Sequence, residues 1–186
     1  VFRPDRTAAS VQAMDQYLLD RSNRLVKLFT PPFTKGTNNP GYINGYVEGV
    51  RENGGQYTHG ACFAAFACYR SGRAGLGYEI LDLLNPLRKY GEAGPSPYRN
   101  EPYVLSGDVY AAPAFLGRGG WSWYTGAAGW YFRIVLEELL GVKTEGERAY
   151  ISPKPPAAWD AFSFTVKLRG TEVAVQAKRG EESTMF

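Results

Sequence analysis

Residues 50–60 combine most of the side-chain types that a binding or catalytic site uses. They hold an arginine, two amides, two hydroxyls, the carboxylate Glu52 and the chain's single histidine, His59. Gly54 and Gly55 stand in the middle, where the backbone must turn tightly or lie close to another group. The apolar run that follows, 61–69, predicts a buried helix. The stretch is therefore either a site mounted on a core helix or an entry loop whose polar groups satisfy one another.

A second dense stretch, 121–130, also leads into a predicted helix. Thr125 and Gly126 stand at its start, where free backbone N–H groups and the positive end of the helix dipole favour an anion. Ordinary capping by Thr125 explains the same residues, and a lone His59 is equally typical of a structural histidine. If His59 faces that helix start, the two stretches together can hold a phosphate group.

Carboxylates and aromatic rings offer a second kind of chemistry. Glu52 and Asp108 both lie in predicted loops beside aromatic residues, and glycoside hydrolysis uses a pair of carboxylates. The sequence does not fix their separation. Trp121 and Trp123 can stack on sugar rings, whereas Trp130 has the helical spacing of a core residue. The residues by themselves thus indicate a helical scaffold with a polar and aromatic cleft for an anion or a sugar.

Composition limits the class of protein. The chain has 186 residues, of which 44% are hydrophobic and 15% aromatic, which indicates a globular fold with one domain or one and a half. The net charge of +3 comes from scattered basic residues, which argues against a nucleic-acid groove. No apolar run is long enough to span a bilayer, and no signal peptide is expected at the start.

The cysteine and histidine content argues against a zinc site. Cys62 and Cys68 lie six residues apart in one predicted helix, roughly 9 Å along its axis, so we expect two free thiols and a reducing compartment. A single histidine and the absence of a CxxC motif leave no residues for zinc.

The predicted elements are mainly α-helices. Thr7 is expected to cap the first helix, 25–29 is either a strand or the exit of that helix, and 30–49 is a long loop. Two alternating segments near the end predict a hairpin that turns at Arg169-Gly170. We therefore expect residues 1–141 to form a helical unit and 142–186 a small β-strand appendage. The predicted helices are 8–19, 61–70, 74–84 and 125–140, and the predicted strands are 162–168 and 171–177.

The stretches 51–59 and 119–130 resemble glycoside hydrolase family 94, which holds inverting β-glucoside phosphorylases. Within that family, the chain is most similar to the C-terminal region of the cyclic β-1,2-glucan synthases. The similarity runs from about Arg6 to Val175 and includes two long motifs in order and at the expected spacing. Shorter matching segments are 31–33, 83–86, 101–104 and 108–110.

This resemblance implies the C-terminal helices of an (α/α)6 barrel, followed by the family's terminal β-strands. Inorganic phosphate would serve as co-substrate and attack the anomeric carbon, with no other cofactor. By the family pattern His59, Thr125 and Gly126 match the phosphate contacts, while a serine is common where Ala127 stands. Glu52 and Gln56 match positions that line the sugar subsites, and Tyr57 and Trp123 are further expected sugar contacts.

The same resemblance implies that no catalytic residue lies in this chain. The family's general acid is an aspartate in an Asp-Trp-Asn-Asp-like motif upstream of these stretches, and this sequence contains no such motif. Loss of a general acid costs about 10²–10⁴ in rate. We therefore expect a C-terminal fragment of a larger enzyme, inactive alone, whose parent resides in the bacterial inner membrane or the cytoplasm.

The alternative is a noncatalytic carbohydrate-binding or docking module. Part of a helical barrel would expose an apolar seam, which favours contact with the remainder of the parent polypeptide or self-association. The expected ligands are a β-glucan or gluco-oligosaccharide and inorganic phosphate, and no nucleic acid.

Overall fold

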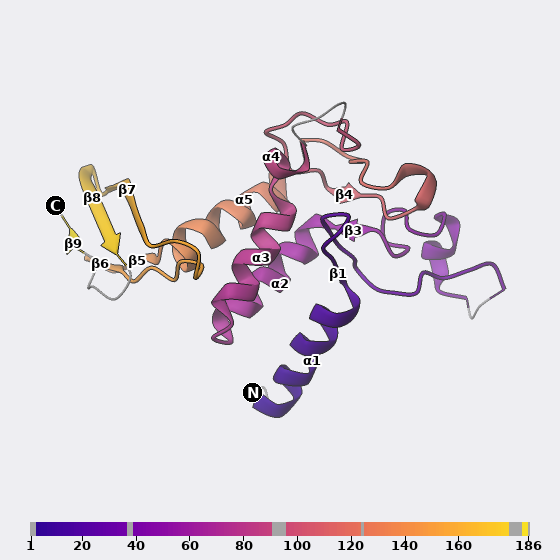
Figure 1. Ribbon diagram of the computed structural model, residues 1–186, viewed down its shortest axis with the longest axis horizontal. Coiled ribbons are helices and arrows are strands. Elements are labelled where there is room, and N and C mark those ends of the chain that lie inside the picture. The colour runs from indigo at the N-terminus through magenta and orange to yellow at the C-terminus, as the bar shows by residue number, and fades with distance from the viewer. Residues whose placement is uncertain (1–2, 37–38, 91–95, 124, 179–183, 186) are drawn as a thin grey trace.

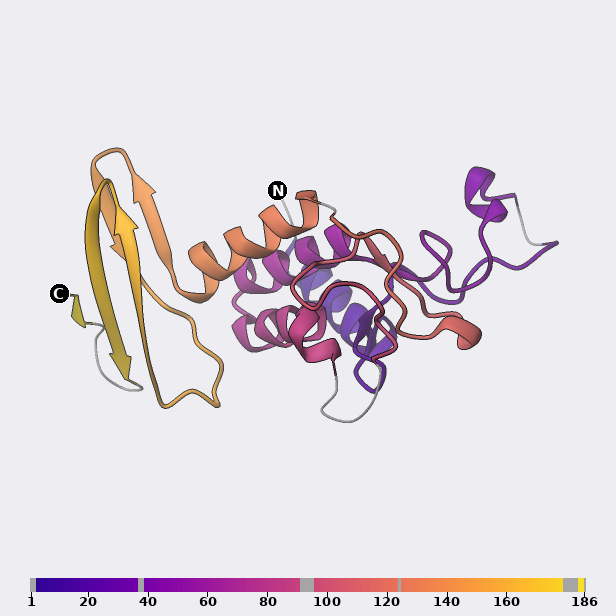
Figure 2. The ribbon, with the colours of Figure 1, turned by 90° about the horizontal axis from the view of Figure 1, so that it is seen from above.

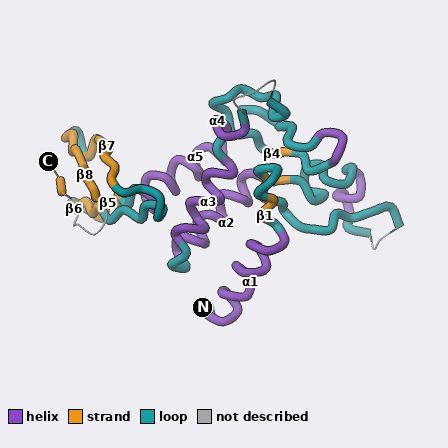
Figure 3. The backbone as a smooth tube through the Cα atoms, in the orientation of Figure 1, coloured by secondary structure: helices purple, strands orange, loops and turns teal. Residues whose placement is uncertain are grey.

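The computed structural model describes residues 3–36, 39–90, 96–123, 125–178 and 184–185. The molecule is elongated, with C-terminal strands at one end, helices in the middle and long loops at the other end (Figures 1 and 2). Colouring by secondary structure shows how much of the end opposite the strands is loop (Figure 3). None of the helices in the described ranges is long and apolar enough to cross a membrane.

Three helices form the centre of the molecule: α2 (Thr58–Arg70) packs against α3 (Ala74–Leu84) and α5 (Thr125–Ile134). Small side chains on α2 allow the close approach. On α3, Gly77 lies so near the buried Tyr69 that a Cβ there would be 2.6 Å from the ring. The helices predicted over 61–70 and 74–84 are confirmed. However, α2 begins three residues earlier, so His59 lies in its first turn.

The first helix, α1 (Pro4–Tyr17), also begins earlier than expected. Thr7 is not its cap: the N-cap is Arg3, and the Thr7 hydroxyl donates to the Arg3 carbonyl. Pro4 at the first helical position explains the shift, because its fixed φ suits that position and its missing N–H costs nothing there. A short hairpin follows, in which β1 (Leu19–Asp20) pairs with β2 (Leu25–Val26), which identifies 25–26 as strand.

Short elements shape the loops. Asn85 caps the four-residue helix α4 (Pro86–Lys89), since its side chain accepts from the Leu87 N–H. The 3₁₀ turns are Gly41–Gly45 and Pro113–Phe115. The strand pair that matters for the site is β3 (Gln56–Tyr57) with β4 (Asp108–Val109).

After Ile134, helix α5 continues as a π-helical segment, Val135–Leu139. The strands that follow form two antiparallel sheets. The predicted hairpin is confirmed, and its turn residues Arg169 and Gly170 have φ of 49° and 89°. The β5–β6 pair was not expected. The strands are β5 (Val142–Glu145), β6 (Arg148–Ile151), β7 (Ala161–Leu168), β8 (Thr171–Lys178) and β9 (Thr184–Met185).

The fold is therefore mixed, and the expectation of a mainly α chain needs correction. The described strands form four small antiparallel sheets, and the described helices do not close into a barrel. Two of those sheets have strands of two residues, too short to show the alternation by which strands are recognised. The division into units 1–141 and 142–186 stays a prediction.

Candidate functional site

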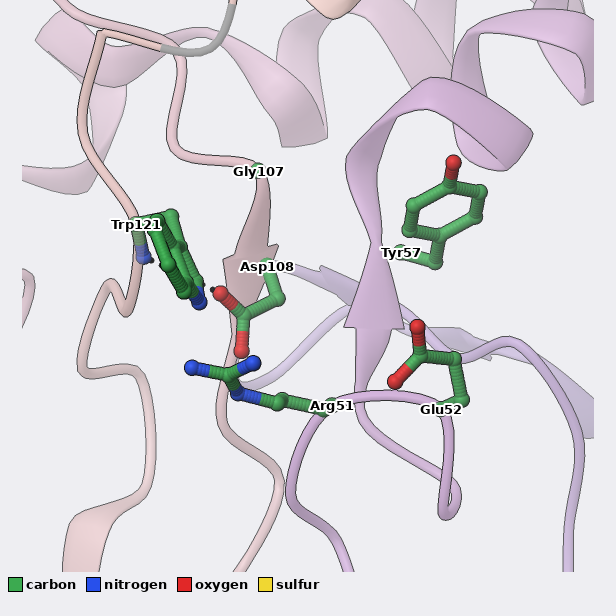
Figure 4. Close-up of a pocket in the computed structure, with 6 residues that line it drawn as sticks. All are labelled: Arg51, Glu52, Tyr57, Gly107, Asp108 and Trp121. Carbon is green, nitrogen blue, oxygen red and sulfur yellow. Dashed lines mark hydrogen bonds between the residues drawn. The ribbon is translucent and has the colours of Figure 1, made fainter. Parts of the chain in front are cut away.

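Three segments far apart in the sequence are joined by backbone hydrogen bonds around β3 and β4. Tyr57 pairs with Asp108, and the Thr58 N–H donates to the Gly107 carbonyl at 3.0 Å. Gly107 in turn donates to the Trp121 carbonyl at 2.7 Å. The dense stretches at 50–60 and 119–130 are thus brought together. They enclose a pocket of about 230 Å³, lined by Arg51, Glu52, Tyr57, Gly107, Asp108 and Trp121 (Figure 4).

A tight turn presents Glu52 to this pocket. Gly54 has φ +84°, and a Cβ on Gly55 would lie 2.8 Å from the Arg51 carbonyl, so both glycines are needed. Asn53 is 1% exposed and fixes the turn, because its amide accepts from the Phe33 N–H and donates to the Phe33 carbonyl. The Asn53 side chain is therefore satisfied by the backbone of the preceding loop, while Glu52 faces the pocket.

Glu52 and Asp108 face the pocket with unused acceptor atoms. Glu52 Oε2 and Asp108 Oδ2 are buried and have no hydrogen-bond partner among the described residues. A buried acceptor without a donor costs about 1–3 kcal/mol. A ligand rich in hydroxyl groups would supply the missing donors to both carboxylates.

Opposing influences act on the pKa of the Asp108 carboxyl. Burial raises the pKa of its carboxyl, and the charge of Glu52 raises it further. Two groups oppose that rise in pKa. One is the backbone N–H of Trp121, which donates to Oδ1 at 3.1 Å, and the other is the Arg51 guanidinium. Gly120 lies against the carboxylate, where a Cβ would be 2.3 Å from Oδ1.

Arg51 and Trp121 form one wall of the pocket. The guanidinium carbon lies 4.9 Å from the centroid of the Trp121 ring and 5.7 Å from that of Tyr46. Figure 4 shows the same guanidinium beside the Asp108 carboxylate. The pocket thus combines two carboxylates, a cation and exposed ring surface, a set suited to a polar ligand with flat apolar faces.

His59 lies beside the start of α5. Gly126 is so close that a Cβ there would be 3.2 Å from His59 Nδ1. The imidazole packs against Phe63 at a centroid distance of 4.8 Å, and its Nε2 is buried without a partner in the described structure. The Cys62 thiol links the same helices, donating to the Ala127 carbonyl at 3.7 Å. The side chain of Thr125, the first residue of α5, lies outside the described part.

The helix-start site adjoins the pocket through Tyr57. The Tyr57 ring lines the pocket and stacks on the His59 ring at a centroid distance of 6.2 Å. The structure therefore brings Glu52 and Tyr57 together with His59 and Gly126, four of the seven residues expected to bind sugar or phosphate.

Gln56 and Trp123 are not brought to the pocket. Gln56 is 1% exposed; its amide accepts from the Val26 N–H and donates to the Thr58 hydroxyl, each at 3.1 Å, so it ties β2 to β3. Trp123 is 68% exposed, and its indole donates to Glu101 at 2.9 Å, away from the two carboxylates.

Two of the residues that line the pocket were not predicted from the sequence, and two others were candidates whose position was left open. Arg51 and Gly107 had no assigned role, while Asp108 and Trp121 were candidates without a known position. The only local signal for Arg51 is that it directly precedes Glu52 in the dense stretch. The decisive signal is the pairing of β3 with β4, which is not local. Among the described residues, no cluster of three or more His, Cys, Asp or Glu could hold a metal ion.

Comparison with known proteins identifies the family of the chain. The family model for the catalytic domain of the glycosyl hydrolase 94 superfamily matches residues 1–141, which include both dense stretches. The chain belongs to this family. It is 39% identical over 180 residues, 96% of its length, to the cyclic beta-(1,2)-glucan synthase NdvB of Rhizobium meliloti.

Other relatives in the family are phosphorylases. The chain is 32% identical to a solabiose phosphorylase of Paenibacillus borealis over 89% of its length, and 27% identical to an N,N'-diacetylchitobiose phosphorylase of Vibrio furnissii over 94%. The match covers only 6% of the NdvB protein, and 21% and 22% of these two phosphorylases. The chain thus spans a small part of the proteins that it resembles.

Proposed function

We propose that this chain supplies the phosphate-binding and sugar-binding part of a phosphorylase catalytic domain that acts on β-glucosides, in a protein of the cyclic β-1,2-glucan synthase type. Its helices would then be the last ones of an (α/α)6 barrel. The observation that carries the proposal is the close approach of His59 to Gly126, directly beside a pocket with two carboxylate oxygens that have no hydrogen-bond partner among the described residues.

Phosphate would bind between His59 and the first turn of α5. There His59 Nδ1, which faces Gly126, can donate a hydrogen bond, and the first backbone N–H groups of α5 have no partner within the helix. The sugar would lie in the adjoining pocket, with its hydroxyls donating to Glu52 and Asp108 and a ring face against Trp121.

In the proposed reaction, a phosphate oxygen forms a bond to the anomeric carbon while the bond from that carbon to the leaving oxygen breaks. The leaving oxygen must gain a proton, and the family's acid is absent from this chain. Because phosphate is already an anionic nucleophile, no second carboxylate is needed to activate water. Glu52 and Asp108 are therefore assigned to binding, and the chain alone is expected to be inactive.

Calorimetry tests the proposal. We expect phosphate to bind the wild-type chain and binding to fall at least tenfold in His59→Ala and in Thr125→Ala, because each change removes one donor to a charged ligand. Thr144→Ala, on the exposed part of β5, is the matched control and should bind normally.

A gluco-oligosaccharide titration separates the two halves of the site. Glu52→Gln should weaken sugar binding and leave phosphate binding intact, whereas Glu147→Gln, in the exposed β5–β6 turn, should change neither. Phosphate binding that survives both His59→Ala and Thr125→Ala would refute the proposed phosphate site.

A further inference from the structure

A second pocket, of about 300 Å³, lies where the β1–β2 turn and the end of α4 meet Pro97 and the turn at Leu116 and Gly117. It shares no lining residue with the pocket that contains Glu52 and Asp108. Its described lining residues are Ser22, Asn23, Arg24, Lys89, Pro97, Leu116 and Gly117. Two of these carry positive charge, and none is acidic.

Lys89 enters this pocket from α4 without an acidic partner among the described residues. Its ammonium group donates to the Arg24 carbonyl at 2.5 Å and lies 6.0 Å from the centroid of the Tyr98 ring. One hydrogen bond leaves further N–H donors on the lysine unused. The Arg24 side chain adds positive charge, and its Nε is buried without a partner in the described structure.

Neighbouring carboxylates are already engaged elsewhere. Asp82 forms ion pairs with Arg24 at 2.7 Å and with Arg88 at 3.3 Å. Asp20 accepts from the side chains of Ser22 and Asn23, and these bonds hold the turn that frames the pocket. Asp20 also pairs with Lys27 at 3.4 Å, so neither acid is free to neutralise Lys89.

The result is a pocket in which Arg24 is paired with Asp82, while Lys89 has no acidic partner among the described residues. Burial lowers the pKa of Lys89 to about 7, and the positive charge of Arg24 lowers it further. A bound anion would reverse both effects, because it would replace lost solvation and offset the repulsion from Arg24.

We propose that this pocket binds a small oxyanion, the phosphate or carboxylate group of a small molecule, with Lys89 as the charged donor and Ser22 at its rim. The site is distinct from the one at His59 and takes no part in attack on a sugar. Its volume accommodates an oxyanion with a few further atoms.

Competitive acetylation of the whole chain, followed by mass spectrometry, tests this proposal with sulfate, phosphate and acetate as probes. Without an added oxyanion, acetylation of Lys89 should show a midpoint near pH 7. A bound oxyanion should raise that midpoint by about one unit, a roughly tenfold fall in acetylation near neutral pH. Lys167, exposed on β7, is the internal reference and should not respond.

Variants separate this site from the proposed function. His59→Ala should leave the response of Lys89 to anions unchanged. A Lys89 midpoint that no probe anion moves would overturn the proposal. Glu92, outside the described residues, is the next acid along the chain. If the wild-type midpoint is that of an ordinary lysine and falls only in Glu92→Gln, the pocket already has its counter-charge and the proposal fails.

Discussion

Two tryptophans two residues apart lie in different surroundings. Trp121 lines the pocket, where its backbone N–H donates to Asp108. Trp123 has φ +59° and lies near Glu101 and Tyr103. The residue type is the same, so the sequence allowed stacking by either ring. A positive φ at a non-glycine residue has no local sequence signal, so the sequence could not show which of the two rings lines the pocket. The assignment of Trp123 to sugar binding stays a prediction.

At the residue scale, Gly126 makes a sharp prediction when it is compared with Gly129 of the same helix. A Cβ at Gly129 meets nothing within 4 Å, so Gly129→Ala should stabilise the chain by about 0.5–1 kcal/mol. A Cβ at Gly126 would press on His59, so Gly126→Ala should gain less stability and should weaken phosphate binding.

Urea denaturation and phosphate calorimetry on both variants measure these effects. Equal phosphate affinity in the two variants would show that the space between Gly126 and His59 is not used by the ligand.

At the element scale, a single buried carboxylate links the helices to the C-terminal strands. Glu138, in the π-helical segment, is 1% exposed and lies near Arg70 of α2, Lys143 of β5 and Lys154. Its Oε1 accepts hydrogen bonds from Arg70 at 3.3 Å and from Lys143 at 3.2 Å. Three cations from separate segments therefore depend on one anion.

Glu138→Gln should lower the free energy of unfolding by about 1.5–3 kcal/mol, because it removes charged hydrogen bonds from a buried position. Glu137→Gln is the matched control: its neighbour Arg133 is half exposed, and such a pair contributes less than about 0.5 kcal/mol. The measurement is urea denaturation of both variants, and similar losses in the two would contradict the assigned role of Glu138.

Elements defined by local patterns could be predicted from the sequence, and those defined by distant partners could not. Helix α3 and the β7–β8 hairpin match the expected ranges closely, since an apolar helical pattern and the Arg169-Gly170 turn are local signals. The pairing of β3 with β4 joins residues far apart in the chain. Together with the turn at Gly54 and Gly55, that pairing sets Glu52 and Asp108 in one pocket. No spacing along the sequence could predict the distance between the two carboxylates.

At the scale of the whole molecule, large apolar side chains remain exposed on the central helices. Phe63 of α2 is 46% exposed and Phe132 of α5 is 67% exposed. Phe63 also contacts Trp130 edge to face. This exposure supports the alternative that the chain docks onto other parts of its parent or onto a second copy.

Sedimentation velocity tests that alternative. The wild-type chain should associate as its concentration rises, and Phe132→Lys should weaken association because a charge is costly to bury. Tyr42→Lys, at the opposite, loop-rich end, is the control and should leave association unchanged. A wild-type chain that stays monomeric at all concentrations would remove self-association from consideration.

The reactivity of the Cys62 thiol reports on the separation of two helices. It is fully buried where α2 meets α5, and burial raises its pKa to about 12, so alkylating reagents cannot attack it in the closed arrangement. A reagent reaches the sulfur only when the two helices part. The rate at which Cys62 is labelled therefore measures how often the start of α5 separates from His59. A phosphate bound between them would lower that labelling rate.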